Sequence, residues 1–123
     1  MPRDFHITDV LTITTGNLVS NRHMAGVYDL LSYMAGEDVY THQIPRVMRE
    51  CEPALRRQHP QLGAADTSGV TPENLAARTV EWVAAFGETL PVAPLSEDQH
   101  ERIDPISELA EMVPPDRIIP VVR

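Results

Sequence analysis

The chain has 123 residues and a formal net charge of −8, because 10 arginines stand against 18 aspartates and glutamates and no lysine is present. This excess of acid argues against a generally basic nucleic-acid-binding protein. The length fits a single domain that can bury a core of its own. A hydrophobic fraction of 42% and a charged fraction of 23% are typical of a folded, soluble protein and exclude a wholly disordered one.

Membrane and secretory signals are absent from the sequence. The longest apolar stretches have four or five residues, as in Trp82–Phe86, whereas a membrane-spanning helix needs about 20. The N-terminal sequence MPRDFHITD lacks the apolar region of a signal peptide. Cys51 is the only cysteine and cannot form an internal disulfide, which agrees with a reducing compartment. We therefore expect a cytoplasmic protein without a membrane contact.

Residues 8–15, with the sequence TDVLTITT, predict the first strand. β-branched residues dominate this stretch, and Gly16–Asn17 follow it as a turn signal.

Residues 22–35 predict a helix that Gly36 ends. Gly26, inside the pattern, indicates the close approach of another backbone. The apolar residues recur at spacings of three and four, at Met24, Val27, Leu31 and Met34.

A second helical pattern begins at Thr41 and ends by His59–Pro60. Pro53 removes an internal hydrogen bond, so we expect a kink or two abutting helices at residues 51–53. The apolar residues of this pattern are Ile44, Val47, Met48, Cys51 and Leu55.

Residues 60–70, with the sequence PQLGAADTSGV, predict a surface loop or internal linker. The sequence Thr71–Pro72–Glu73 then starts a helix, because a capping hydroxyl, a proline and an acid all suit a helix N-terminus. This helix is expected to end at Gly87.

The last third of the chain is rich in proline. Residues 90–95 (LPVAPL) are expected to be extended and to form an edge strand at most. The stretch Ser96–Gln99 matches a capping box, and Asp104–Pro105 starts either the second part of a broken helix or a separate short helix. Residues 117–122 (RIIPVV) predict a final short strand.

These elements place strands near both chain ends and helices between them. The economical fold is one α+β domain over residues 1–123, in which a small sheet pairs the N- and C-terminal strands and three to four helices pack on it. Because no strand candidate is long, a mainly α domain with extended, proline-rich ends is the alternative.

The residues that could carry out chemistry show no catalytic or metal-binding motif. His42, Cys51 and His59 lack the spacing of metal ligands, since the sequence contains no C-x-x-C, H-x-x-x-H or H-E-x-x-H. Cys51 belongs to the apolar stripe of its helix and lacks the signature of an activated thiol. A chain without lysine also excludes a Walker-type nucleotide site. We therefore expect no metal and no other cofactor.

One predicted helix carries most of the basic residues of the first half, at Arg46, Arg49, Arg56 and Arg57. Arg46 and Arg49 lie one turn apart, opposite the apolar stripe, where they could grip phosphate or a partner's carboxylates. Because Arg46 can pair with Glu50 on the same helix, an ordinary solvated face is the alternative.

Three tyrosines, Tyr28, Tyr33 and Tyr40, lie around the helix predicted over residues 22–35. An exposed tyrosine among them would suit a binding hot spot. The alternative is that they seal the core or a dimer contact.

The acid is concentrated toward the C-terminus. Residues 1–60 carry 6 Arg and 7 acids, whereas residues 61–123 carry 4 Arg and 11 acids. Such a surface can imitate a phosphate backbone or meet a basic partner, although a solvated face that aids solubility is the alternative. The densest run comprises Glu97, Asp98, Glu101, Asp104, Glu108, Glu111 and Asp116.

Four blocks within about residues 6–62 stand out, TDVLTITTG, GVYDLL, THQIPR and RRQHPQL. On these blocks the first half of the chain resembles a family of small uncharacterised proteins carried on bacteriophage genomes. The resemblance implies a phage setting and a bacterial host, and it assigns no role to any residue.

A short acidic chain without a catalytic motif is best interpreted as a binding protein. We expect a phage accessory factor that inhibits a host protein or nucleoprotein complex, for instance of the anti-CRISPR or another anti-defence type. Its acidic surface would comprise Glu97, Asp98, Glu101, Asp104, Glu108 and Glu111, and a second contact would comprise Arg46, Arg49, Arg56, Arg57, Tyr33 and Tyr40. The alternatives are a homo-oligomeric virion or assembly component, such as a homodimer, and a small enzyme with a site among His23, His42, Cys51 and nearby arginines.

Overall fold

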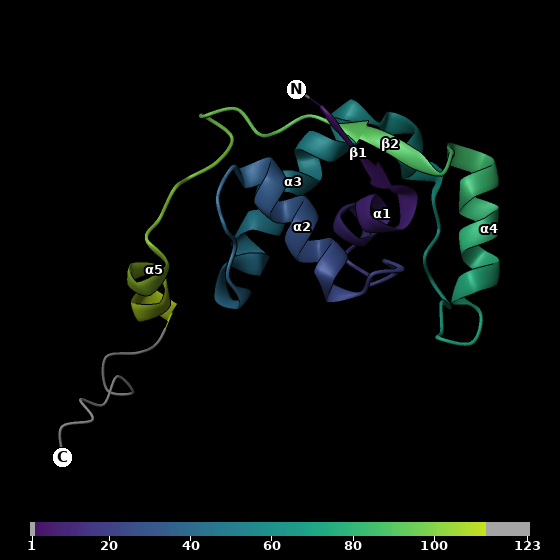
Figure 1. The fold of residues 1–123 in the computed structure, drawn as a ribbon, viewed down its shortest axis with the longest axis horizontal. Helices are drawn as coiled ribbons and strands as arrows, with labels where there is room; N and C mark the ends of the chain where they lie inside the picture. Colours follow the sequence, from purple (N-terminus) through teal and green to yellow (C-terminus); the bar gives the residue numbers. More distant parts are fainter. Residues whose placement is uncertain (1, 113–123) are drawn as a thin grey trace, which may run out of the picture.

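The computed structural model describes residues 2–112 of the chain, which contain five α-helices, two 3-10 helices and one two-stranded sheet (Figure 1). The expected α+β class is therefore confirmed. In chain order the elements are β1 (Arg3–His6), α1 (Ile7–Thr15), α2 (Met24–Ala35), the 3-10 helix η1 (Thr41–Gln43), α3 (Ile44–Gln58), the 3-10 helix η2 (Pro60–Ala64), α4 (Leu75–Phe86), β2 (Thr89–Val92) and α5 (Pro105–Met112).

Helix α1 lies at the centre of the molecule, and the prediction of a strand over residues 8–15 was wrong. It contacts α2, α3, α4 and both strands (Figure 1), and its residues 7–14 are all buried. Thr12 Oγ1 donates to the carbonyl of Thr8 at 2.9 Å and Thr15 Oγ1 donates to that of Leu11 at 2.6 Å, whereas the Thr8 hydroxyl bonds the His6 ring at 2.8 Å. Gly16, with a φ of 78°, ends the helix in the left-handed conformation.

The sheet pairs β1 with β2 in antiparallel register, so that Phe5 faces Leu90 and Asp4 faces Pro91. In a two-stranded sheet both strands are edges, which is why Pro91 is tolerated and why the predicted edge strand is confirmed. The ring of His59 donates to the carbonyl of Pro91 at 2.6 Å. The N-terminal strand thus pairs with residues 89–92, while the strand predicted over residues 117–122 lies outside the described residues.

Helices α2 and α3 form where the apolar spacing predicts them. Gly36 ends α2 in the left-handed conformation, and Pro45 lies in the first turn of α3. Helix α3 continues through Pro53 as one element, so of the two predicted alternatives, a kink or two abutting helices, the second is wrong. Gly26 adjoins the side chains of Asp9 and Ser20, so the prediction of a close backbone at this position was wrong.

The remaining elements follow most of the predicted boundaries, but α4 begins at Leu75 and not at Thr71–Pro72–Glu73, because residues 72–74 form a turn in which the Asn74 amide donates to the Thr71 hydroxyl at 3.2 Å. The region expected as a loop over residues 60–70 begins with η2 and continues as irregular chain, and Gly87 ends α4 as predicted. Residues 96–99 form a turn, closed by the Gln99 side chain on the Ser96 amide at 2.8 Å. A separate short helix, α5, begins at Pro105, and Asp104 caps it through the Ser107 amide at 3.0 Å.

The hydrophobic core is continuous from the sheet to η2. It is built around α1 and includes Trp82 of α4 as well as Leu90 and Val92 of β2. Within residues 2–112, no helix has the length and apolarity to cross a membrane.

Candidate binding surface

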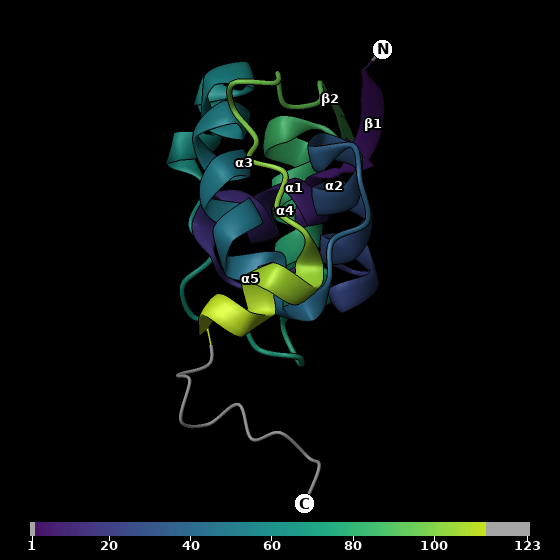
Figure 2. The same cartoon turned by 90° about the vertical axis from the view of Figure 1, so that its left-hand side faces the viewer.

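The chain after β2 runs down one side of the molecule, across α3 and the connection between α2 and η1, and reaches α5 (Figure 2). We call residues 96–112 the acidic segment. The amide of Leu95 donates to the carbonyl of Met34 at 2.9 Å and so fixes the start of this path at the end of α2. The segment has little regular structure before Pro105, so side chains must hold it against the helices.

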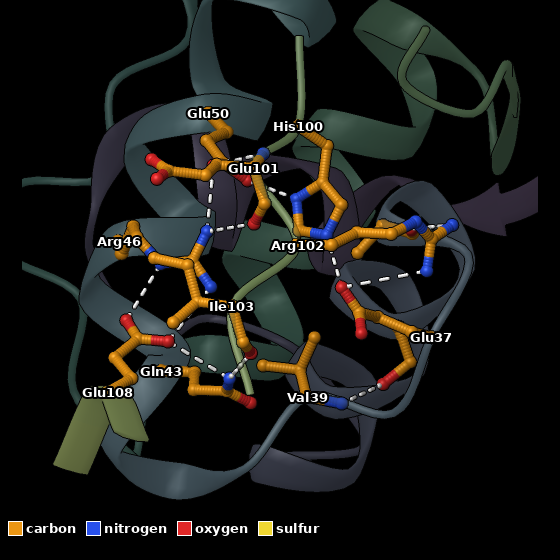
Figure 3. Close-up of polar contacts among 12 residues, drawn as sticks. Glu37, Val39, Gln43, Arg46, Glu50, His100, Glu101, Arg102, Ile103 and Glu108 are labelled. Atoms are coloured by element: carbon orange, nitrogen blue, oxygen red, sulfur yellow. Dashed lines mark hydrogen bonds and ion pairs between the residues drawn. The ribbon is translucent and has the colours of Figure 1, made fainter. Parts of the chain in front are cut away.

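Arg46 of α3 holds the acidic segment through hydrogen bonds to two of its residues, Glu101 and Glu108 (Figure 3). Its Nε donates to Glu108 Oε2 at 2.7 Å and its Nη2 donates to Glu108 Oε1 at 2.9 Å, which is a two-pronged contact. Its Nη1 donates to the backbone carbonyl of Glu101 at 2.7 Å and to Glu50 Oε2 at 2.9 Å. The predicted pairing of Arg46 with Glu50 is thus confirmed, and the carboxylates that Arg46 grips belong to its own chain.

Glu108 is buried and does not belong to an open acidic surface. Its side chain is 4% exposed, and Gln43 Nε2 donates to its Oε1 at 3.0 Å. The hydrogen bonds and positive charge of Arg46 hold the pKa of Glu108 below its ordinary value, against the opposing effect of burial. The placement of Glu108 in the exposed acidic surface was therefore wrong, because this carboxylate serves to dock α5.

His100 makes a second set of contacts that hold the acidic segment, to α3 and to the end of α2 (Figure 3). Its Nδ1 lies 2.5 Å from Glu50 Oε1 of α3, and its Nε2 lies 2.6 Å from Glu37 Oε2, just after α2. The His100 side chain is 5% exposed. Arg102 adds a longer contact to Glu37, with 3.7 Å between Nη1 and Oε2. Glu50 therefore contacts both Arg46 and His100. The acidic segment in this way connects α3 with the end of α2.

Four carboxylates of the acidic segment remain on the outside. Glu97, Asp98, Glu101 and Asp104 are exposed. A hydrogen bond from the Ser96 hydroxyl lowers the pKa of Asp98. Among the described residues none of these four carboxylates has an ion-pair partner. The Glu111 side chain lies outside the described part of the structure.

The other arginines of α3 differ in their availability. Arg56 pairs with Glu52 one turn earlier and donates to the carbonyl of Thr14, so it braces α1. Arg49 and Arg57 are exposed and make no ion pair with a described residue. The four arginines therefore do not act as one patch, since Arg46 and Arg56 are engaged within the chain.

Of the tyrosines, Tyr40 is the exposed one. It is 52% exposed, and its ring stacks on the His42 ring with 6.5 Å between centroids. The hydroxyl of Tyr33 donates to the carbonyl of Val92 at 3.0 Å, and the hydroxyl of Tyr28 bonds that of Thr41. Tyr40 alone thus meets the exposure that we required of a binding hot spot.

The residues of the enzyme alternative occupy separate environments. Cys51 is fully buried, and burial raises the pKa of its thiol to about 12, which opposes formation of a nucleophilic thiolate. His23 is exposed beside Asn21, whereas the ring of His42 donates to the carbonyl of Pro105 at 2.7 Å. Within residues 2–112, no three His, Cys, Asp or Glu residues are grouped so that they could hold a metal ion.

A second polar network, which the sequence did not indicate, supports the loop between α1 and α2. The buried carboxylate of Asp9 accepts from the Ser20 hydroxyl and from Arg22 Nη2, the latter at 2.5 Å. Arg22 and Arg3 both reach Asp29 of α2, and the hydrogen bonds from Arg3 are the main cause of a lowered Asp29 pKa. This network joins β1, α1 and α2.

Comparison with known proteins gives a family match over the first half of the chain. Residues 5–65 match the model of a family described as a domain of unknown function (DUF7736). The match extends from β1 through η2 and therefore includes Glu37, Arg46 and Glu50, which anchor the acidic segment, but not the segment itself. No curated protein and no solved structure matches the chain.

Proposed function

We propose that the protein is a non-enzymatic, phage-encoded binding protein that inhibits a host defence complex. In this proposal the exposed side of the acidic segment meets a basic surface that otherwise binds nucleic acid, as an anti-CRISPR or another anti-defence inhibitor would. The resemblance of residues 6–62 to phage-borne proteins supports the setting, and the location of the exposed carboxylates supports the mode of binding.

The observation that supports the proposal is that some side chains of the acidic segment hold it to the helices while others are exposed. Glu108 and His100 face inward and hold the chain to α2 and α3, while Glu97, Glu101 and Asp104 are exposed without an ion-pair partner in the described structure. Because the inner contacts already order this backbone, binding would cost less conformational entropy than ordering a free acidic tail. Carboxylates held at fixed positions can compete with phosphates for arginine and lysine side chains.

The experiment is affinity capture from a bacterial host lysate with two charge-matched variants. In one variant Glu97→Gln, Glu101→Gln and Asp104→Asn neutralise the acidic segment, and Asn at position 104 keeps a capping residue for α5. In the control Glu73→Gln, Glu81→Gln and Glu88→Gln remove the same charge from exposed positions around α4. We expect the control to retain the captured complex and the segment variant to lose it.

The biological readout is the plating efficiency of a defence-sensitive phage on cells that express the protein. Wild type and control should raise the plating efficiency, and the segment variant should raise it much less. If both variants capture and inhibit alike, the acidic mechanism is wrong. If the wild-type chain captures no host component and leaves plating unchanged across defence systems, the inhibitory function is wrong.

A further inference from the structure

An apolar hollow of about 570 Å³ lies between η1 and the start of α5. Tyr40 and His42 form one side, and Pro105, Ile106 and Leu109 form the other. Figure 2 shows α5 at the far end of the acidic segment, and Asp104, one of the exposed carboxylates of that segment, lines the hollow.

The hollow carries unusually exposed apolar side chains. Ile106 is 78% exposed, Leu109 is 44% exposed and Tyr40 is 52% exposed. Single exposed apolar residues are ordinary, but several around one concave site are typical of a docking surface. The buried contact of α5 is made by Glu108, so Ile106 and Leu109 are not needed to hold the helix in place.

The walls of the hollow are ordered before any partner arrives. The His42 ring stacks on Tyr40 and donates to the carbonyl of Pro105, which links the two walls directly. The two-pronged contact between Arg46 and Glu108 fixes the following turn of α5. A preformed site of this kind requires little ordering when a ligand binds.

The carboxylates at the hollow favour a basic partner over an acidic one. Asp104 lines the hollow, and among residues 2–112 no arginine does. Glu101 is exposed three residues earlier. In a two-fold symmetric dimer a second copy would bring its own Asp104 and Glu101 to the same place, and these carboxylates would also repel an anionic membrane.

We infer that this hollow receives an apolar side chain from a segment of the partner protein that carries arginine or lysine beside that side chain. A basic amphipathic helix has this chemistry, with its apolar residues in the hollow and its cations on Asp104 and the neighbouring carboxylates. The inference rests on the proposed function and deepens it, since the acidic surface supplies attraction and the hollow supplies an anchor.

The test uses the full chain labelled with nitrogen-15. Three synthetic peptides of about 14 residues are titrated into it, and NMR spectra of the protein report their binding. The first peptide combines leucines at helical spacing with arginines on the other face. In the second peptide alanine replaces leucine, and in the third glutamate replaces arginine. We expect saturable shifts at Tyr40, His42, Ile106 and Leu109 with the first peptide, and at least tenfold weaker binding of the other two.

Two protein variants complete the test. Ile106→Ser should weaken binding of the first peptide about tenfold, whereas Val80→Ser on α4, where Val80 is 69% exposed, should not change it. Equal binding of the leucine and alanine peptides, or no effect of Ile106→Ser, would overturn the hollow as an anchor. A dimer in sedimentation that Ile106→Ser dissolves would also overturn it, because a second copy would then be the occupant.

The outcome of the lysate capture is independent of this test. If Ile106→Ser leaves peptide binding intact while neutralising Glu97, Glu101 and Asp104 still abolishes capture, the proposed function stands and the hollow has no part in it. If capture and inhibition fail for the wild-type chain while the first peptide binds as described, the proposed function falls and the hollow remains a site for basic amphipathic segments.

Discussion

Gly26 of α2 adjoins the buried carboxylate of Asp9. A Cβ at this position would collide with Asp9 Oδ1 and Ser20 Oγ, and both atoms belong to the network that holds the loop between α1 and α2. We expect Gly26→Ala to lower the free energy of unfolding by roughly 1–3 kcal/mol, as overpacking does. Urea denaturation measures this change.

The matched control is Gly63→Ala. Nothing lies within 4 Å of a Cβ at position 63, which is in η2. This variant should unfold at the same urea concentration as wild type or slightly above it. Equal destabilisation by both substitutions would show that packing around Asp9 is not the reason for the glycine.

Cys51 gives a second test at the scale of one residue. Burial raises the pKa of its thiol to about 12, so at pH values below this the neutral thiol predominates. In the native protein at about pH 8 we expect labelling by a thiol reagent only at the rate of unfolding, and rapid labelling in urea. Rapid labelling of the native chain would instead restore Cys51 as a reactive residue.

At the scale of the element, the acidic segment depends on one buried ion pair. Glu108→Gln removes the charge that faces Arg46, and breaking such a pair is strongly destabilising. The peptide bond after Arg102 lies between two anchored carbonyls, those of Glu101 and Ile103. We expect trypsin to cut after Arg102 at least tenfold faster in Glu108→Gln, because an acidic segment that is released from α3 can enter the active site of the protease.

Glu97→Gln is the control for that cleavage, since Glu97 is exposed and makes no ion pair with a described residue. Mass spectrometry of the digest identifies the bond that is cut. An unchanged rate in Glu108→Gln would mean that the contact of Arg46 with Glu108 does not hold the acidic segment.

The same ion pair predicts a dependence on pH. Arg46 lowers the pKa of Glu108 from its ordinary 4.5, and a carboxyl group whose pKa is lower in the folded state stabilises the fold above that range. Its contribution is lost as the pH falls through the folded pKa. In NMR spectra we therefore expect amides of α5 to report release below pH 4.5, while α1 stays folded at the onset of release. Release at the same pH in Glu108→Gln would contradict the assignment.

The helical state of α1 could not be predicted from its own residues. The stretch TDVLTITT has the β-branched composition of a strand, and a helix buried on all sides has no polar face to produce a period of 3.6. Its helical state depends on α2, α3, α4 and the sheet that enclose it. The amphipathic helices α2 and α3, by contrast, show their buried face in the apolar spacing, and the caps at Gly36, Asp104 and Gly87 are local signals.

At the scale of the whole molecule, the sequence indicated the acidic surface but not its anchors. Exposed acids were recognisable as a run over residues 97–104. The contacts of His100 with Glu37 and of Arg46 with Glu108 join residues more than sixty positions apart, and no local pattern in a single sequence reports such a contact. For the same reason Glu108, which resembles its neighbours in sequence, was expected outside and lies inside.

In the proposed function the exposed acids of a segment held in place bind a basic partner. The most direct measurement is the affinity for the captured host component in about 0.05 M and 0.5 M salt, for wild type and for the variant neutralised at Glu97, Glu101 and Asp104. We predict that the wild-type affinity falls steeply with salt and that the variant binds more weakly, with a shallower dependence on salt. Equal affinities and equal salt dependence in the two proteins would contradict binding through these acids.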